Sequence, residues 1–291
     1  MELTKIKRRL LLSFGIIILL LVSISFVGGW FSISNKMTEA LSKLTQKEKE
    51  RIFNLDLLPT VSGAFFQVRF TFTYVSNILL GASLILLAIM PKYVWIKRLF
   101  FFSIVYITIT FTIFWFIIVP YVYFFVKESN KIPLIEIILT FLVHLINPII
   151  GISFFITTRK TIVLNKYDLY LSSLFSFFYY FFTVAVYFVG IKVVDEFLTN
   201  FKISEKEKNG WDIYIKLQIT IYPMMNFREP WGYSGDSIFL KVLLNLSFPS
   251  LSVLFTISVS WFWKSVCKIK LYNEKIKKDQ DFLKYNKFIK L

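Results

Sequence analysis

The chain has 291 residues, of which 56% are hydrophobic and 19% aromatic, and its formal net charge is +16. Soluble domains are less apolar and lack uncharged stretches of bilayer length, so the composition indicates an integral membrane protein. The single histidine and single cysteine exclude a multi-histidine or cysteine-cluster metal site and an intrachain disulfide, and we expect no metal or cofactor.

Six apolar stretches are long enough to cross a bilayer core of about 30 Å. They cover residues 10–30, 71–90, 100–126, 132–157, 170–191 and 238–264. A backbone in lipid must satisfy its own hydrogen bonds, so we predict an all-α protein with six transmembrane helices in one polytopic domain, residues 1–291. Pro120 should kink or shorten the third span. The first stretch follows a basic segment as a signal peptide does, but its length and the lack of a cleavage site favour an uncleaved helix.

Lysine and arginine predict the orientation of the spans. They gather before the first span, in residues 92–98 and 159–166, and in the tail of residues 265–291. With six spans these segments lie on one side, which the positive-inside rule makes cytoplasmic, so both termini are expected there. This pattern also explains the net charge without a nucleic-acid partner. Abundant lysine, isoleucine, phenylalanine and asparagine suggest an AT-rich bacterial genome, and hence a bacterial plasma membrane.

Two segments on the opposite side are expected to be ordered. Residues 43–51, "KLTQKEKER", are polar and helix-prone, which predicts a surface helix. The long outer loop, residues 192–237, contains "IYPMMNFREPWGY" at residues 221–233. Aromatic residues of this kind favour a membrane–water interface, so we expect this segment to lie there.

Polar residues gather on one helical face in the second and fourth spans. At roughly 100° per residue, four side chains in each span fall within about 100° of one another. The fourth span contributes Glu136, Thr140, His144 and Asn147, and the second contributes Arg69, Thr73, Ser76 and Asn77.

Both spans run toward the cytoplasm, so their residues can be matched by depth. Counting from the cytoplasmic ends, near Pro91 and Thr157, predicts three pairs, within one helical turn. These are Arg69 with Glu136, Thr73 with Thr140, and Asn77 with His144.

His144 is the only histidine, and it lies within an apolar run. An ionisable side chain in hydrocarbon turns inward and finds a partner, so one interpretation is a packing histidine held by Asn77. The other is catalytic. Burial disfavours the charged imidazole, and a neutral ring can take a proton from Thr73 or Ser76 to create a nucleophile. In that case Asn77 could fix the tautomer or stabilise an oxyanion, and Arg69 and Glu136 would form a polar mouth.

The motifs "FTYVSN" in the second span and "HLINP", beginning at His144, resemble the androgen-induced family of membrane hydrolases and its bacterial six-helix relatives. "IYPMMNF" is similar to a Tyr-Pro segment of the bacterial members, and the likeness covers about residues 65–250. The resemblance implies Thr73 as nucleophile, His144 as base and a fatty acid ester as substrate. The spacing from threonine to asparagine differs by one from the eukaryotic pattern, which leaves Ser76 open as the nucleophile.

Three functions therefore remain open at the level of sequence: a lipid-ester hydrolase, a small-molecule binding or transport subunit, and a structural membrane protein without catalysis. Hydrolysis requires both a hydroxyl and His144, whereas binding should survive the loss of one hydroxyl. In each case the expected surroundings are membrane lipids, and the oligomeric state is left open.

Overall fold

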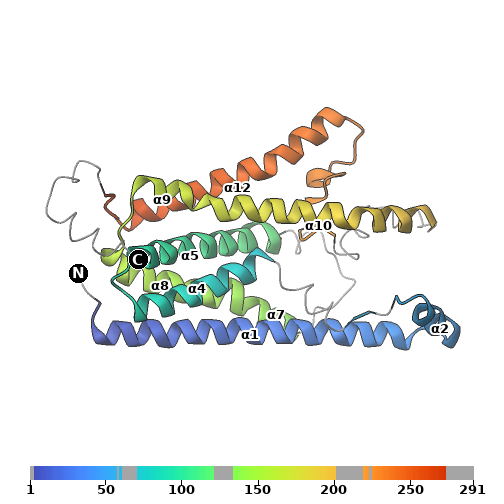
Figure 1. Cartoon of the computed structure of the whole chain (residues 1–291), viewed down its shortest axis with the longest axis horizontal. Helices are drawn as coiled ribbons and strands as arrows, with labels where there is room; N and C mark the ends of the chain where they lie inside the picture. Colours follow the sequence, from blue (N-terminus) through green and yellow to red (C-terminus); the bar gives the residue numbers. More distant parts are fainter. Residues whose placement is uncertain are drawn as a thin grey trace. The chain divides into compact units, whose positions relative to one another are not determined.

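The computed structural model describes residues 3–57, 59–60, 71–120, 134–200, 219–222 and 225–272, without the side chains of residues 197–200. Within these residues the protein is all-α, apart from one isolated bridge between Leu164 and Leu271. Six of the described helices are long and apolar enough to cross a membrane, which confirms the predicted fold class (Figure 1). They cover Lys5–Ser42, Phe72–Ile89, Val94–Ile118, Leu134–Thr161, Lys166–Glu196 and Ile238–Val266.

Several helices extend beyond the apolar stretches that predicted them, because a helix continues through polar residues of good propensity. The first, α1 (Lys5–Ser42), has 38 residues and outlasts its apolar part at both ends. The third begins six residues early, as α5 (Val94–Ile113), and continues into the π-helical turn η1 (Phe114–Ile118) shortly before Pro120. A π turn is one way in which a disturbed helix re-forms its backbone bonds.

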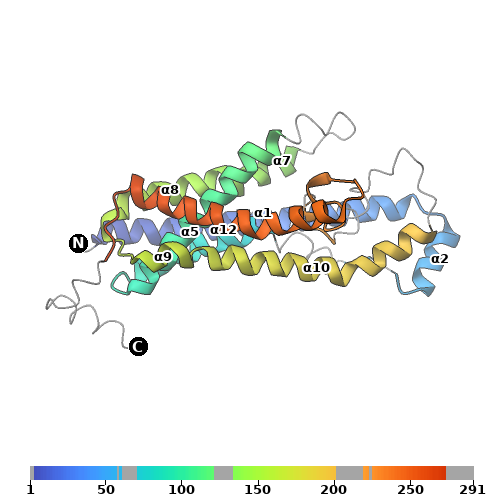
Figure 2. The ribbon, with the colours of Figure 1, turned by 90° about the horizontal axis from the view of Figure 1, so that it is seen from above.

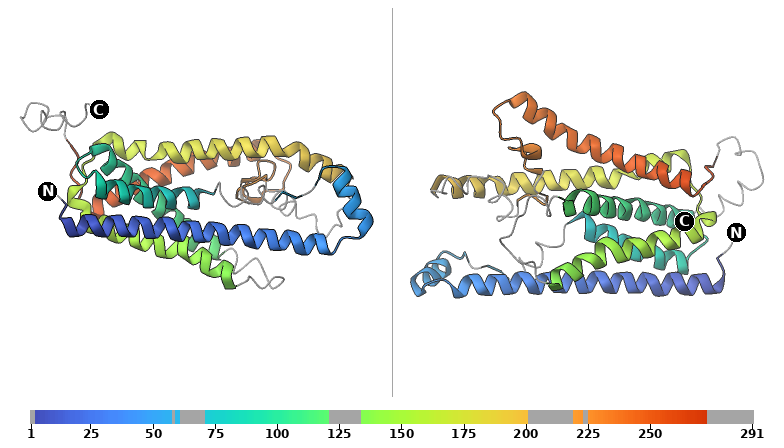
Figure 3. Two further views of the ribbon diagram at one scale, coloured as in Figure 1. Left: turned by 60° about the horizontal axis from the view of Figure 1, so that its bottom comes forward. Right: turned by 180° about the vertical axis from the view of Figure 1, so that it is seen from behind.

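The chain divides into two compact units, and the first comprises residues 1–166 and 263–291. In this unit α4 (Phe72–Ile89) packs between α1 and α5, and the fourth span packs against all three (Figures 1 and 3). That span consists of α7 (Leu134–Phe141), the π turn η2 (Leu142–Ile146) and α8 (Asn147–Thr158). It therefore changes its helical pattern at its centre, where the histidine lies.

Two glycines allow α1 and α4 to approach closely. A Cβ atom on Gly15 would lie 2.9 Å from the Gly81 carbonyl oxygen, and one on Gly81 would lie 3.1 Å from the Gly15 carbonyl oxygen. Helices in lipid gain little from apolar burial alone, so close backbone approach at small residues is a main source of their association.

The polar segment after α1 forms the expected helix, α2 (Gln46–Asn54). Thr45 begins it with a capping box, in which its hydroxyl accepts from the Glu48 N–H and the Glu48 carboxylate accepts from the Thr45 N–H. The hydrogen bonds from the backbone and side chain of Thr45 lower the pKa of Glu48. This helix forms from local sequence alone.

The second unit, residues 167–262, contains most of α9 (Lys166–Leu171), α10 (Ser173–Asn200) and most of α12 (Ile238–Val266). Buried hydroxyl pairs join its helices: Ser172 to Ser260 at 2.6 Å, and Ser176 to Thr256 at 2.9 Å. Away from these pairs α10 and α12 diverge (Figures 1 and 3).

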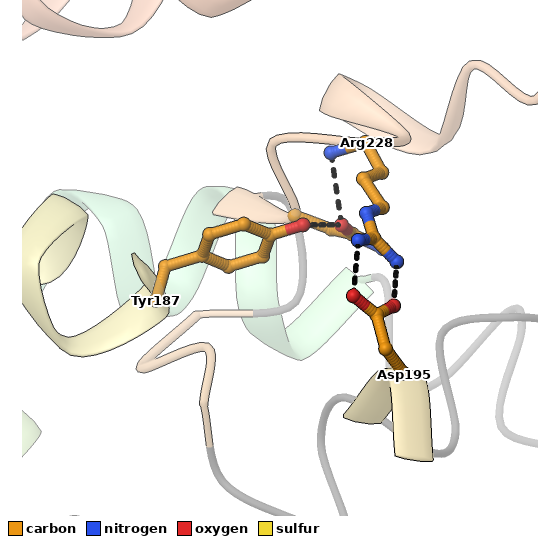
Figure 4. Close-up of polar contacts among 4 residues, drawn as sticks. Tyr187, Asp195 and Arg228 are labelled. Carbon is orange, nitrogen blue, oxygen red and sulfur yellow. Dashed lines mark hydrogen bonds and ion pairs between the residues drawn. The ribbon is translucent and has the colours of Figure 1, made fainter. Parts of the chain in front are cut away.

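The segment that precedes α12 is ordered where the structure describes it. Asn226 accepts from the Tyr187 hydroxyl at 3.2 Å and from the Arg228 N–H at 3.1 Å, and Arg228 forms a two-fold ion pair with Asp195 of α10 (Figure 4). These contacts agree with the expectation of an ordered outer segment, whereas its position at a membrane interface stays a prediction.

Candidate functional site

The two polar faces meet, because α4 and the fourth span are parallel neighbours. Thr73 contacts His144, Asn77 contacts Asn147, and Leu80 lies where a Cβ on Gly151 would be. The residues of the first two pairs are 71 and 70 positions apart in the chain.

The adjacency was predicted correctly, and the register differs from the named pairs by about one helical turn, which is within the tolerance of that prediction. Thr73 meets His144 rather than Thr140, and Asn77 meets Asn147 rather than His144.

The Thr73 hydroxyl lies 3.2 Å from Nε2 of His144. The other ring nitrogen, Nδ1, lies 2.9 Å from the carbonyl oxygen of Thr140. A carbonyl only accepts, so Nδ1 carries the proton, and in the neutral ring Nε2 is the acceptor. The Thr73 hydroxyl therefore donates to Nε2. Thr140 holds the tautomer, a role that the sequence had suggested for Asn77.

A proline explains much of the polar chemistry around the histidine. In η2 the Asn147 N–H bonds the Leu142 carbonyl, five residues earlier. Pro148 comes next and has no N–H. An N–H at position 148 would bond the Val143 carbonyl in a π-helical pattern or the His144 carbonyl in an α-helical pattern. Side chains from neighbouring helices donate to both carbonyls instead: Asn77 to Val143 at 3.1 Å, and Trp115 to His144 at 3.1 Å.

Two aromatic residues of η1, which the sequence pattern did not predict, complete the site. The Phe114 ring stacks on the imidazole with centroids 3.9 Å apart and an interplanar angle of 22°, while Trp115 donates to the His144 carbonyl. Both residues lie on the π turn η1, and they contact His144 on the π turn η2. The nearby Pro120 was the only local signal for an irregular helix at this depth.

Ser76, the rival nucleophile, is fully buried and turned toward α5. Its hydroxyl bonds the Thr73 carbonyl at 2.9 Å and the Thr110 hydroxyl at 2.9 Å. The structure thus brings Thr73, and not Ser76, to the imidazole.

The side chain of Asn77 bonds to the backbone of both helices in this site. One amide hydrogen goes to the Thr73 carbonyl at 2.8 Å and the other to Val143, so neither is left for an oxyanion. Asn147 donates to Asn77 Oδ1 at 2.8 Å, while its own side-chain carbonyl oxygen is buried without a partner in the described part of the chain.

Glu136 lies apart from this cluster, in the first turn of α7. Its carboxylate accepts from Ser32 and, at 2.8 Å, from Lys36, both on α1. Arg69, its predicted partner, lies outside the described residues. The carboxylate therefore ties α7 to α1, and the predicted mouth of Arg69 and Glu136 stays a prediction.

Six apolar helices with a hydroxyl–imidazole pair between two of them define the class: the protein is a multi-pass membrane protein. No family model matches the chain, and neither a curated protein nor a solved structure matches it significantly.

Proposed function

We propose that this protein is an intramembrane hydrolase of lipid esters, with Thr73 as nucleophile and His144 as general base. The observation that carries the proposal is the bond from the Thr73 hydroxyl to Nε2, with Nδ1 held by the Thr140 carbonyl. A hydroxyl is a poor nucleophile until an adjacent base takes its proton, and a base oriented through its second nitrogen is the usual arrangement. The same activity is the one implied by the resemblance to the androgen-induced family.

The reaction follows from these atoms. As Thr73 Oγ1 attacks the ester carbonyl carbon, its proton passes to Nε2 of His144. The ring then gives that proton to the departing alkoxide, which leaves an acyl-threonine and a free alcohol. Water, deprotonated by the same nitrogen, hydrolyses the acyl-threonine and restores the hydroxyl.

The depth of the pair suits an ester of a membrane lipid. Thr73 lies 16 residues before Ile89, the C-terminal end of α4, which corresponds to roughly 24 Å along a helix in a core of about 30 Å. With both termini cytoplasmic in a bacterial plasma membrane, as we propose, the pair lies in the outer leaflet. Nearby Ile137 and Phe141 are exposed by 41% and 40%, so lipid can reach this side of the fourth span.

The experiment compares three variants in detergent micelles, by fluorophosphonate labelling and by hydrolysis of a long-chain ester. Thr73→Val removes the hydroxyl at constant shape, and His144→Gln keeps hydrogen bonding but not basicity. Each should lower the rate at least about 100-fold. Ser76→Ala is the matched control and should keep its activity. A stable Gln variant that still hydrolyses the ester rules out His144 as the base.

A second candidate function is a binding or structural membrane protein in which the same residues only pack. The observation in its favour is that Asn77 and Trp115 donate to backbone carbonyls beside Pro148. Wild-type protein without labelling or hydrolysis, together with a destabilised His144→Ala and an unaffected His144→Gln, would support this reading.

A further inference from the structure

A cavity of about 340 Å³ lies in the first unit, where α1 begins and α8 ends. Both helix ends are at the same end of this unit (Figures 1 and 2). The cavity is separate from the histidine site, which lies more than ten residues away along α8 and its π turn. Its lining residues are Leu3, Thr4, Lys7, Ile156, Thr157, Thr158, Arg159, Lys160 and Thr161.

Three of the lining residues are cations with donors to spare. Lys7 makes one long bond, 3.4 Å, to the Thr157 carbonyl, and Arg159 makes one bond of 2.8 Å to the Ile156 carbonyl. An ammonium has three donors and a guanidinium has five. In the described part of the chain none of the three cations, Lys160 included, is paired with a carboxylate.

The neighbouring Arg8, in contrast, bonds two carbonyls at a helix end. Its guanidinium donates to the Ala88 carbonyl at 2.7 Å and to the Ile89 carbonyl at 3.2 Å, and so caps the end of α4. Cations near a helix C-terminus are stabilising for this reason. Lys160 also lies at a helix end, but among the residues that the structure describes it makes no such hydrogen bond to a carbonyl.

Besides the three cations, the cavity is lined by four threonines and by two apolar residues. Leu3 and Ile156 contribute to its wall, and Ile156 is 41% exposed on a helix that is apolar enough to span a membrane. A free phosphate would contact the cations and leave this wall uncovered. A phospholipid would fill both parts, with its phosphate among the cations and the start of an acyl chain along Ile156.

We propose that this cavity binds the headgroup phosphate of an anionic phospholipid in the leaflet on the side of the N-terminus. Basic residues at a membrane surface attract anionic lipids, and each is worth roughly fivefold in affinity. The proposal is independent of the hydrolase function, because the lipid is a bound component here and not a substrate.

The test uses the full chain in nonionic detergent and measures the binding of short-chain phosphatidylglycerol by native mass spectrometry. Lys160→Ala should lower its affinity about fivefold, and Lys7→Ala with Lys160→Ala about 25-fold. Arg9→Ala is the matched control, since it removes the same charge from the same end without lining the cavity, and should change affinity less than about twofold.

Two further ligands identify the source of the phosphate. Short-chain phosphatidylcholine, which has no net charge, should bind at least about tenfold more weakly than phosphatidylglycerol. Inorganic phosphate at equal concentration should not compete with phosphatidylglycerol. Equal binding of the two lipids, competition by phosphate, or equal effects of Lys160→Ala and Arg9→Ala would each overturn the proposal.

Discussion

Pro148 organises the residues around the histidine. It has no N–H, and the two carbonyls that it could have bonded accept instead from Asn77 and Trp115 on other helices. A buried carbonyl without a donor costs about 1–3 kcal/mol. The asparagine and the tryptophan therefore hold the interrupted span in place, and with it the ring of His144.

The contacts around Pro148 predict that the effects of substituting Trp115 and Pro148 on stability depend on each other. Trp115→Phe should destabilise the protein by about 1–3 kcal/mol, because it leaves the His144 carbonyl without its donor. In a Pro148→Ala background Trp115→Phe should cost less stability, because the backbone N–H of the alanine can bond the His144 carbonyl in place of Trp115. Unfolding in detergent, analysed as a double-mutant cycle, measures the difference. Trp95→Phe on the same helix, where the side chain is 52% exposed, is the control, and strictly additive effects would contradict the account.

The tautomer of His144 can be observed directly, because the chain contains one histidine. Labelling with ¹⁵N-histidine should yield signals from a single imidazole, with the proton on Nδ1 and a bare Nε2 at neutral pH. Thr73→Val should leave this tautomer in place, because the Thr140 carbonyl holds it. A proton found on Nε2 instead would reverse the direction of the bond to Thr73 and remove the base from the proposed reaction.

Helix contacts are decided by a few small residues. At Gly15 an added Cβ would meet Ile85 at 2.7 Å and a backbone oxygen at 2.9 Å, which cannot move without shifting α4. At Gly28 the three nearest atoms to the added Cβ all belong to the Leu139 side chain, the nearest at 2.5 Å, and none is a backbone atom. The two glycines of α1 thus have different packing roles.

These positions give a prediction for the α1–α4 contact. Gly15→Ala gains about 1 kcal/mol of helix propensity but should lose about 1–3 kcal/mol to overpacking, for a net loss of stability. Gly28→Ala gains the same propensity and should be close to neutral. Thermal unfolding of both variants in the same detergent tests this, and a Gly15→Ala variant as stable as the wild type would contradict it.

At the scale of the whole molecule, the charge pattern sets the orientation that we propose. An even number of spans places the basic N-terminal segment and the basic tail on the same side, and the positive-inside rule makes that side cytoplasmic. In the orientation that we propose, the cavity at the beginning of α1, with its three cations, faces the inner leaflet and its anionic lipids.

Reporter fusions test this topology. A reporter after Leu291 should be active only in its cytoplasmic form, and a reporter inserted at Lys206, between the fifth and sixth spans, only in its external form. Both reporters on the same side would contradict the six-span topology. Fusions at Lys92 provide the control for a short cytoplasmic loop.

Local sequence determined much of this protein. Hydrophobic length and the lack of charge are properties of a segment by itself, so the six spans could be predicted. The polar faces of the second and fourth spans follow from helical periodicity, and the capping box at Thr45 needs only four consecutive residues. Since lipid forces polar faces inward, the adjacency of those two spans could be predicted as well.

The tertiary structure alone decided which residues meet. Counting from Ile89 and Thr158, where α4 and α8 end, instead of from Pro91 and Thr157 moves the match by three residues toward the observed contact of Thr73 with His144. The register depends on helix ends, which apolar pattern locates only within a few residues. Trp115 and the α1 partners of Glu136 are distant in sequence, and no local pattern predicts them. Their contacts arise because buried carbonyls and carboxylates must find donors wherever neighbouring helices supply them.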